Sequence, residues 1–185
     1  MAAADHSLEA RLAARLPTLY EKITFLQRAG SYGPLVTEVT SHETHMSLVF
    51  LAGERAYKLK KPVRFPYLDF STVERRETVC RAELKLNRRL APNIYLDVVP
   101  LTYSERGLTI GGEGKVVDWL VVMSRLDQAQ MLDRAIANGW LRRWQLDRVV
   151  GTLVRFYRHA SAELIAPTAY VAGFQRSLAY DLRIL

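Results

Sequence analysis

The order of extended and helical segments constrains the fold of this chain more than any other feature. Hydrophobic periodicity and turn residues indicate strands, one helix, more strands, and then helices only. The predicted strands are Leu35–Ser41, Met46–Ala52, Arg55–Pro62, Ile94–Tyr103, Leu108–Ile110 and Lys115–Ser124. The predicted helices are 7–29 (interrupted at Pro17), 71–90, 128–137, 141–161 and 168–184. This order predicts an α+β protein in two parts, with a boundary near residue 125.

Turn and capping signals mark the boundaries of the first strands and of the central helix. Gly53-Glu54 separates two predicted strands with the spacing of a β-hairpin. Ser71, with Glu74 three positions later, is a capping box that begins a helix predicted to end at Leu90. Val63–Asp69, which contains a proline, is predicted as a loop between the hairpin and this helix.

The net charge of +7 makes a nucleic-acid-binding domain one alternative. The basic residues, however, are spread along the chain beside Asp and Glu. The tight groups, Lys58-Leu59-Lys60-Lys61 and Arg88-Arg89, interrupt regular elements instead of forming a tail. A phosphate-bearing small molecule explains a local basic strand equally well, so nucleic acid is the less favoured partner.

Cysteine content and hydropathy bear on the cellular compartment. Cys80 is the only cysteine, so the chain forms neither an internal disulfide nor a cysteine-based zinc site, as fits the reducing cytoplasm. No apolar run approaches the ~20 residues of a membrane helix. The N-terminal residues mix Asp5 and Glu9 with arginines, unlike a signal peptide. We therefore expect a cytoplasmic protein without a membrane partner.

Glu83 has an unusual position in the predicted helix 71–90. At about 100° per residue, Val79, Leu86 and Leu90 form a narrow apolar stripe, and Glu83 falls at its centre. A carboxylate on an apolar face is costly unless a cation meets it. The sequence therefore indicates a cation partner, and a boundary glutamate that reaches water is the alternative.

Two lysines of the preceding strand could supply that cation. Ala56, Lys58 and Lys60 point to the same face of the strand. In kinases a small residue makes room for adenine, and a lysine two positions later bridges the phosphates to a helix glutamate. We favour Lys58 over Lys60 because Ala56 precedes it by two residues, and we expect Lys58 within about 6 Å of Glu83. A lysine-rich edge strand is the structural alternative.

Three segments of the chain carry a resemblance to a known family. They are Val49–Phe65, Leu68–Arg76 and Glu83–Pro92. These segments resemble a poorly characterised bacterial family of aminoglycoside-phosphotransferase-like proteins, many of which are fused to a C-terminal P-loop ATPase domain. The resemblance covers residues 35–185, and its most specific parts are Tyr57–Pro62 and Leu68–Thr72.

The resemblance implies a protein-kinase-like fold with a small lobe of antiparallel strands plus one helix, followed by a helical large lobe. The implied ranges are 1–34 for an N-terminal helical segment, 35–125 for the small lobe, and 126–185 for the start of the large lobe. Val122–Leu126 would be the linker whose backbone holds the adenine of ATP. The implied nucleotide-binding residues are Ala56, Lys58, Lys60, Glu83, Met123 and Ser124.

The implied function is the ATP-binding part of a small-molecule phosphotransferase that acts on an unknown hydroxyl-bearing acceptor. The family's His-Gly-Asp catalytic loop is missing, because no histidine is followed two positions later by Asp. We therefore assign no catalytic residue or metal ligand here, expect Mg²⁺ only in the complete protein, and expect the chain to be truncated and inactive alone. A non-catalytic kinase-like binding or regulatory module is the alternative.

Two further groups of side chains are not assigned to a site. His42 and His45 do not match the usual zinc-ligand spacings, so no metal centre is predicted. Four aromatic side chains of the second half are predicted to lie in the core instead of forming a base-stacking platform. They are Trp119, Trp140, Trp144 and Phe156.

Overall fold

The structure is a computed structural model that describes residues 15–161 and 164–182. The chain divides into two compact units, Met1–Arg143 and Trp144–Leu185. The described part of the first unit contains an antiparallel sheet with helices on both faces, and that of the second unit is helical. The chain is therefore α+β, as predicted.

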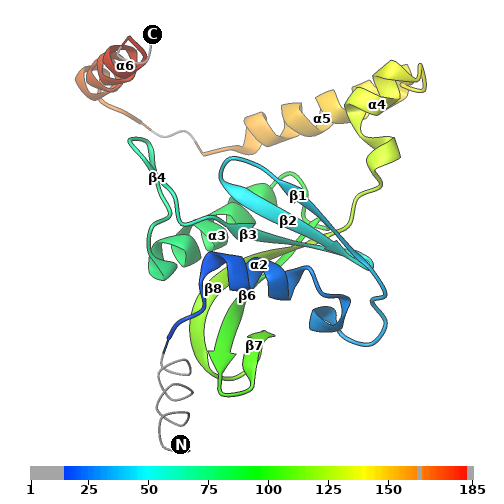
Figure 1. The fold of residues 1–185 in the computed structure, drawn as a ribbon. Helices are drawn as coiled ribbons and strands as arrows, with labels where there is room; N and C mark the ends of the chain where they lie inside the picture. The colour runs from blue at the N-terminus through cyan, green and yellow to red at the C-terminus, as the bar shows by residue number, and fades with distance from the viewer. Residues whose placement is uncertain (1–14, 162–163, 183–185) are drawn as a thin grey trace, which may run out of the picture. The chain divides into compact units, whose positions relative to one another are not determined.

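Six antiparallel strands form one curled sheet in the first unit (Figure 1). In sheet order they are β1 (Val39–Glu43), β2 (Ser47–Ala52), β3 (Arg55–Lys60), β8 (Lys115–Ser124), β6 (Tyr95–Ser104) and β7 (Gly107–Ile110). Thus β8, the last strand in the sequence, lies between β3 and β6. All strands of this sheet except β1 agree with the predicted ranges to within two residues. The Gly53-Glu54 turn joins β2 to β3 as predicted, with Ala52 opposite Arg55.

The first strand begins later than predicted. The prediction was Leu35–Ser41, whereas β1 begins at Val39. The preceding residues form a turn in which the N–H of Val36 donates to the carbonyl of Gly33 (3.3 Å), and the side chain of Leu35 is 94% exposed. The turn therefore uses residues whose apolar character suggested a strand.

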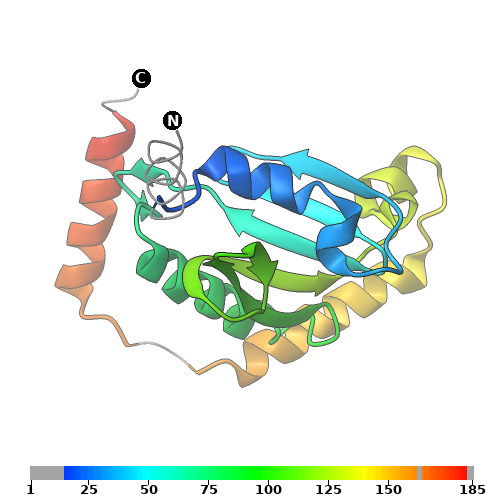
Figure 2. The ribbon, with the colours of Figure 1, turned by 60° about the horizontal axis from the view of Figure 1, so that its bottom comes forward.

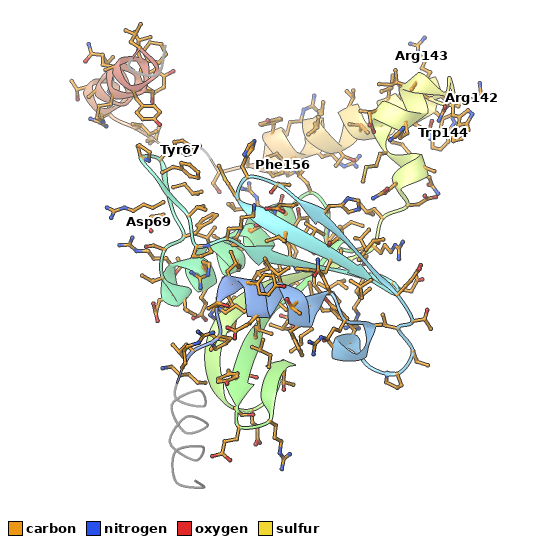
Figure 3. The ribbon with its side chains drawn as sticks, viewed as in Figure 1. Tyr67, Asp69, Arg142, Arg143, Trp144 and Phe156 are labelled. Carbon is orange, nitrogen blue, oxygen red and sulfur yellow. The ribbon has the colours of Figure 1, made fainter. Side chains whose placement is uncertain are left out.

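The predicted loop 63–69 is instead a small second sheet. It consists of β4 (Arg64–Phe65) and β5 (Leu68–Asp69), which pair as an antiparallel hairpin. The rings of Phe65 and Tyr67 stack on this hairpin with centroids 5.8 Å apart. Tyr67 and Asp69 are labelled on it in Figure 3.

Helix α3 (Val73–Asn87) follows the hairpin and has a different cap from the predicted one. The Thr72 hydroxyl accepts a hydrogen bond from the N–H of Arg75 (3.3 Å), while Ser71 is bound to Asp69. The predicted capping box that begins at Ser71 is therefore wrong. The helix also ends three residues before the predicted Leu90.

Helix α2 (Leu19–Leu26) belongs to the predicted helix 7–29, the first part of which lies outside the described residues. It begins after Pro17, the predicted interruption, and ends three residues early. Thr18 and Glu21 form a capping box: the Thr18 hydroxyl accepts from the N–H of Glu21 (3.3 Å), and the Glu21 carboxylate accepts from the N–H of Thr18 (2.6 Å).

The sheet separates two apolar clusters of the first unit. On one face, Leu26 of α2 packs on a large cluster that includes Phe50, Leu59 and Leu120. On the other face, Cys80 of α3 packs against Val98 and Val121, with Trp119 at the edge of this smaller cluster. In Figure 2 the strands pass between α2 and α3. Helix α3, which carries Glu83, therefore packs on the opposite sheet face from α2.

The helices that follow the sheet have residue ranges close to the predicted ones. The predicted helix 128–137 is a 3₁₀ turn (Gln128–Gln130) followed by α4 (Leu132–Ala137). Helices α5 (Arg143–His159) and α6 (Pro167–Asp181) match the last two predicted helices to within three residues. Among residues 15–161 and 164–182, no helix has both the length and the apolar character needed to cross a membrane.

Two of the four aromatic residues predicted for the core are exposed. Trp140 and Trp144 are 58% and 57% exposed, which corrects that prediction. Trp119 and Phe156 are half-buried; Figure 3 labels Trp144 and Phe156 on α5. The periodic pattern of α5 identified a helix correctly, but none of its residues is buried in the structure.

Candidate functional site

Glu83 binds both candidate lysines of β3. Lys58 donates a hydrogen bond from Nζ to Oε1 of Glu83 (2.9 Å), and Lys60 donates from Nζ to Oε2 (2.5 Å). The predicted approach of Lys58 to Glu83 is therefore confirmed. Lys60, predicted as a competing partner, binds the same carboxylate at the same time. We refer to these three side chains as the lysine–glutamate triad.

The two lysines of the triad differ in their exposure. The side chain of Lys58 is 28% exposed, whereas that of Lys60 is 5% exposed. The Lys60 ammonium group also lies 5.0 Å from the ring centroid of Phe70, which is a cation–π contact. Lys60 is thus enclosed by the protein, and Lys58 is the lysine that an incoming anion can reach.

Glu83 faces the sheet, but the predicted apolar stripe of the helix is not the face that packs on the sheet. Leu86 and Leu90 are 57% and 43% exposed, so the predicted stripe is not the buried face. The buried face instead carries Arg76, Cys80 and Glu83, which follow the i, i+4, i+7 spacing of one helix face. Polar residues can occupy this face because oppositely charged groups on the sheet meet them.

The triad has an excess of positive charge. Burial raises the pKa of Glu83, but the hydrogen bonds and charges of Lys60 and Lys58 lower this pKa by a larger amount. The pKa of Glu83 therefore lies below the usual range of a glutamate. Glu83 is therefore ionised at neutral pH, and one carboxylate faces two ammonium groups. The triad carries one net positive charge in a partly buried setting, which favours an anionic ligand.

The sheet face that carries the triad continues over β2 and β1. Side chains directly opposite each other in antiparallel strands lie on one face. One such row contains His42, Val49 and Lys58, and the next contains Thr40, Leu51, Ala56 and Met123. A pocket of about 530 Å³ lies beside these rows. It is lined by Thr40, His42, Leu51, Glu54, Arg125, Leu126, Asp127 and Gln128.

The predicted linker begins inside β8, and its two candidate residues differ. Met123 is opposite Ala56, on the face of the triad. The Ser124 hydroxyl donates to the carbonyl of Asn93 (2.9 Å), and the backbone N–H groups of Ser124 and Arg125 also donate to carbonyls of the chain. Met123 therefore lies with the triad, whereas Ser124 is engaged elsewhere.

A second group of charged side chains, which sequence reasoning missed, is buried in the first unit. Asp118 of β8 is 1% exposed and accepts hydrogen bonds from Nε (2.7 Å) and Nη2 (3.0 Å) of Arg76. Lys22 of α2 donates to the same carboxylate (2.8 Å). We call these three residues the aspartate cluster. Its signal in the sequence was an isolated aspartate within an apolar strand.

Polar residues beside the pocket do not form a metal centre. Within the described ranges, no group of three or more His, Cys, Asp or Glu side chains is placed to bind a metal ion. His42, which borders the pocket, has its Nε2 atom 2.9 Å from Nε2 of Gln128. Gln128 follows the linker, so this contact connects β1 to the segment after β8.

The triad predicts a dependence of stability on acid. Because the pKa of Glu83 is lowered in the folded protein, its contribution is complete above its unfolded value of 4.5 and is lost as the pH falls through the folded pKa. Glu83→Gln should therefore cost about 1–3 kcal/mol at neutral pH, and this difference should shrink in acid. Urea unfolding of both proteins at a series of pH values measures the difference. A gap that is constant down to pH 3 would contradict this role of Glu83.

Comparison with protein-family models gives no match, and no solved structure matches the chain. Curated relatives include uncharacterised proteins of Mycobacterium tuberculosis and Mycobacterium bovis. Each is 39% identical to the chain over 118 residues, which is 64% of this chain and 22% of the relative. The chain therefore spans about a fifth of the length of the curated relatives that it matches.

Proposed function

We propose that this chain is the nucleotide-binding part of a kinase-like small-molecule phosphotransferase, and that Lys58 binds the phosphates of ATP. The lysine–glutamate triad carries the proposal. It supplies an accessible ammonium group, that of Lys58, and a helix carboxylate that orients it at 2.9 Å, and the small residue Ala56 lies beside it, two positions earlier on the same strand face. Kinase-like proteins use this combination to hold the phosphates of ATP.

The pocket beside the triad supports a nucleotide as the ligand. Its volume of about 530 Å³ is within the range of small-molecule sites. Its lining combines the apolar Leu51 and Leu126 with several polar groups, which suits a ring that carries hydroxyl groups. The pocket adjoins the row of Ala56 and Met123, and Lys58 lies in the next row. A nucleoside in the pocket would thus have an anion-binding ammonium group nearby.

Each residue of the triad would have a separate role in binding ATP. Lys58 would attract and orient the phosphates, Glu83 would hold Lys58, and Lys60 would keep Glu83 ionised. ATP would supply the phosphoryl group. Transfer to a hydroxyl-bearing small molecule is the proposed activity of the whole protein, and we assign neither the acceptor-activating group nor Mg²⁺ ligands to this chain.

Lys58→Met is expected to weaken ATP binding about tenfold or more, because it removes the accessible charge that meets the phosphates. Lys60→Met is the comparison variant: it removes the same charge from the same strand face, but at a side chain that is only 5% exposed and would act on the phosphates only through Glu83. Compared with Lys58→Met, we expect Lys60→Met to lower the melting temperature more and to weaken ATP binding less. Titration calorimetry with a non-hydrolysable ATP analogue, with and without Mg²⁺, measures the affinity of both variants.

Three results would oppose the proposal. Wild-type protein that binds no nucleotide would remove it, and equal binding by wild type and Lys58→Met would remove the role of Lys58. Binding of RNA or DNA that is stronger than ATP binding and falls steeply with salt would favour a nucleic-acid partner instead. Competition between ATP and a short oligonucleotide, measured at low and moderate salt, separates these ligands.

A further inference from the structure

Helix α3 is fixed to the sheet by two charged contacts on one of its faces. Arg76 binds Asp118 of β8, and seven residues later Glu83 binds Lys58 and Lys60 of β3. Seven residues are close to two helical turns, so both contacts lie on the same side of α3. The same side of α3 is therefore held to the sheet at both points.

We propose that Asp118 is a positioning residue that holds Arg76, and through it α3, so that Glu83 reaches Lys58. The inference rests on the proposed function, because it treats Lys58 as the residue that meets the phosphates. Asp118 suits this role because both its oxygens are occupied. Oδ1 accepts from Nε of Arg76, and Oδ2 accepts from Nη2 of Arg76 and from Nζ of Lys22. The forked contact with Arg76 fixes direction as well as distance.

The N-terminal helix takes part in the same arrangement. Lys22 of α2 is 7% exposed, and its ammonium group donates to Asp118 (2.8 Å) and to the carbonyl of Val117 (2.7 Å). A carboxylate that is 1% exposed needs its cations, because removing one partner leaves a buried charge uncompensated. Helix α2 therefore braces the carboxylate that positions α3, and the nucleotide site depends on a helix packed on the other face of the sheet.

Cys80 provides a reporter for the position of α3. It lies between Arg76 and Glu83 on the buried face and is 0% exposed. It is the only cysteine of the chain, and burial raises its pKa to about 11. An alkylating reagent can modify this thiol only when α3 moves away from the sheet or the protein unfolds. The rate of alkylation therefore measures the opening of α3 without any nucleotide.

The test uses Arg76→Lys, which keeps the charge but loses the fork, and Lys22→Met, which removes the brace. Both are expected to increase the alkylation rate of Cys80 and to weaken binding of the ATP analogue, each by about tenfold. Lys85→Met, on the exposed side of α3, is the matched control and should change neither. Low concentrations of urea should barely affect the faster alkylation, because local opening exposes little surface.

The possible results separate a positioning role from a structural one. Alkylation that accelerates steeply with urea in Arg76→Lys would mean that the thiol reacts through global unfolding, and the proposal would fail. It would also fail if both variants alkylated at the wild-type rate, or if ATP affinity stayed unchanged while wild type bound ATP. Wild type that binds no ATP would remove the proposed function, whereas faster, urea-insensitive alkylation would still support the anchoring of α3 by Asp118.

Discussion

Replacing Asp118 by alanine is expected to lower the free energy of unfolding by about 3–5 kcal/mol. The substitution leaves the guanidinium group of Arg76 and the ammonium group of Lys22 at sites that are only 3% and 7% exposed. Neither cation would then have a carboxylate in the aspartate cluster. Urea unfolding followed by tryptophan fluorescence measures the loss, since Trp119 adjoins the substituted residue.

Two further variants show whether burial of charge is the cause. A triple variant, Lys22→Met with Arg76→Met and Asp118→Leu, removes all three charges and should recover most of the lost stability. Glu77→Ala breaks the exposed pair with Arg81 on α3 and should cost about 0.5 kcal/mol or less. A loss below about 1 kcal/mol for Asp118→Ala would show that water reaches the cluster.

Local sequence signals were sufficient to predict the bounds of much of the sheet. The alternation in Arg55–Lys60, together with the Gly53-Glu54 turn, indicated the hairpin of β2 and β3, and the apolar run 115–124 has the bounds of β8. Each of these signals lies within about ten residues of sequence. They could not show that β8 lies beside β3, because that order is set by packing between distant segments.

The buried face of α3 could not be read from apolar periodicity. The prediction assumed that the face toward the core would be the most apolar one, through Leu86 and Leu90. The structure buries Arg76 and leaves both leucines exposed. The deciding partner of Arg76 is Asp118, 42 positions away, and a pairing at such distance leaves no periodic trace in the helix.

The chemistry of the candidate site was more predictable than its surroundings. The spacing of Ala56 and Lys58 and the order of strand and helix were enough to pair Lys58 with Glu83. The simultaneous contact of Lys60 was not predicted, since two lysines on one strand face were expected to compete for one carboxylate. A carboxylate has two oxygens and can accept from both.

Hydrogen exchange is expected to separate the two units by about a thousandfold or more in protection. Strands β2, β3 and β8 contain fully buried side chains, including Phe50, Leu59 and Leu120. Their amides should exchange only through openings close to global unfolding, which costs about 5–15 kcal/mol in ordinary domains. In the second unit, by contrast, α5 has no buried residue, and helices of 15 to 17 residues are marginal in water by themselves.

The apolar side chains of the second unit give this prediction its control. Val150, Phe174 and Leu178 are 57%, 64% and 50% exposed, so they add little to the stability of α5 and α6 as described. Exchange measured by mass spectrometry at two protein concentrations would detect any surface that covers them. Strong protection of α5 that disappears on dilution would mean that a second copy covers it. Strong protection at every concentration would contradict the exposure of these helices, because amides of an uncovered helix open locally at little cost.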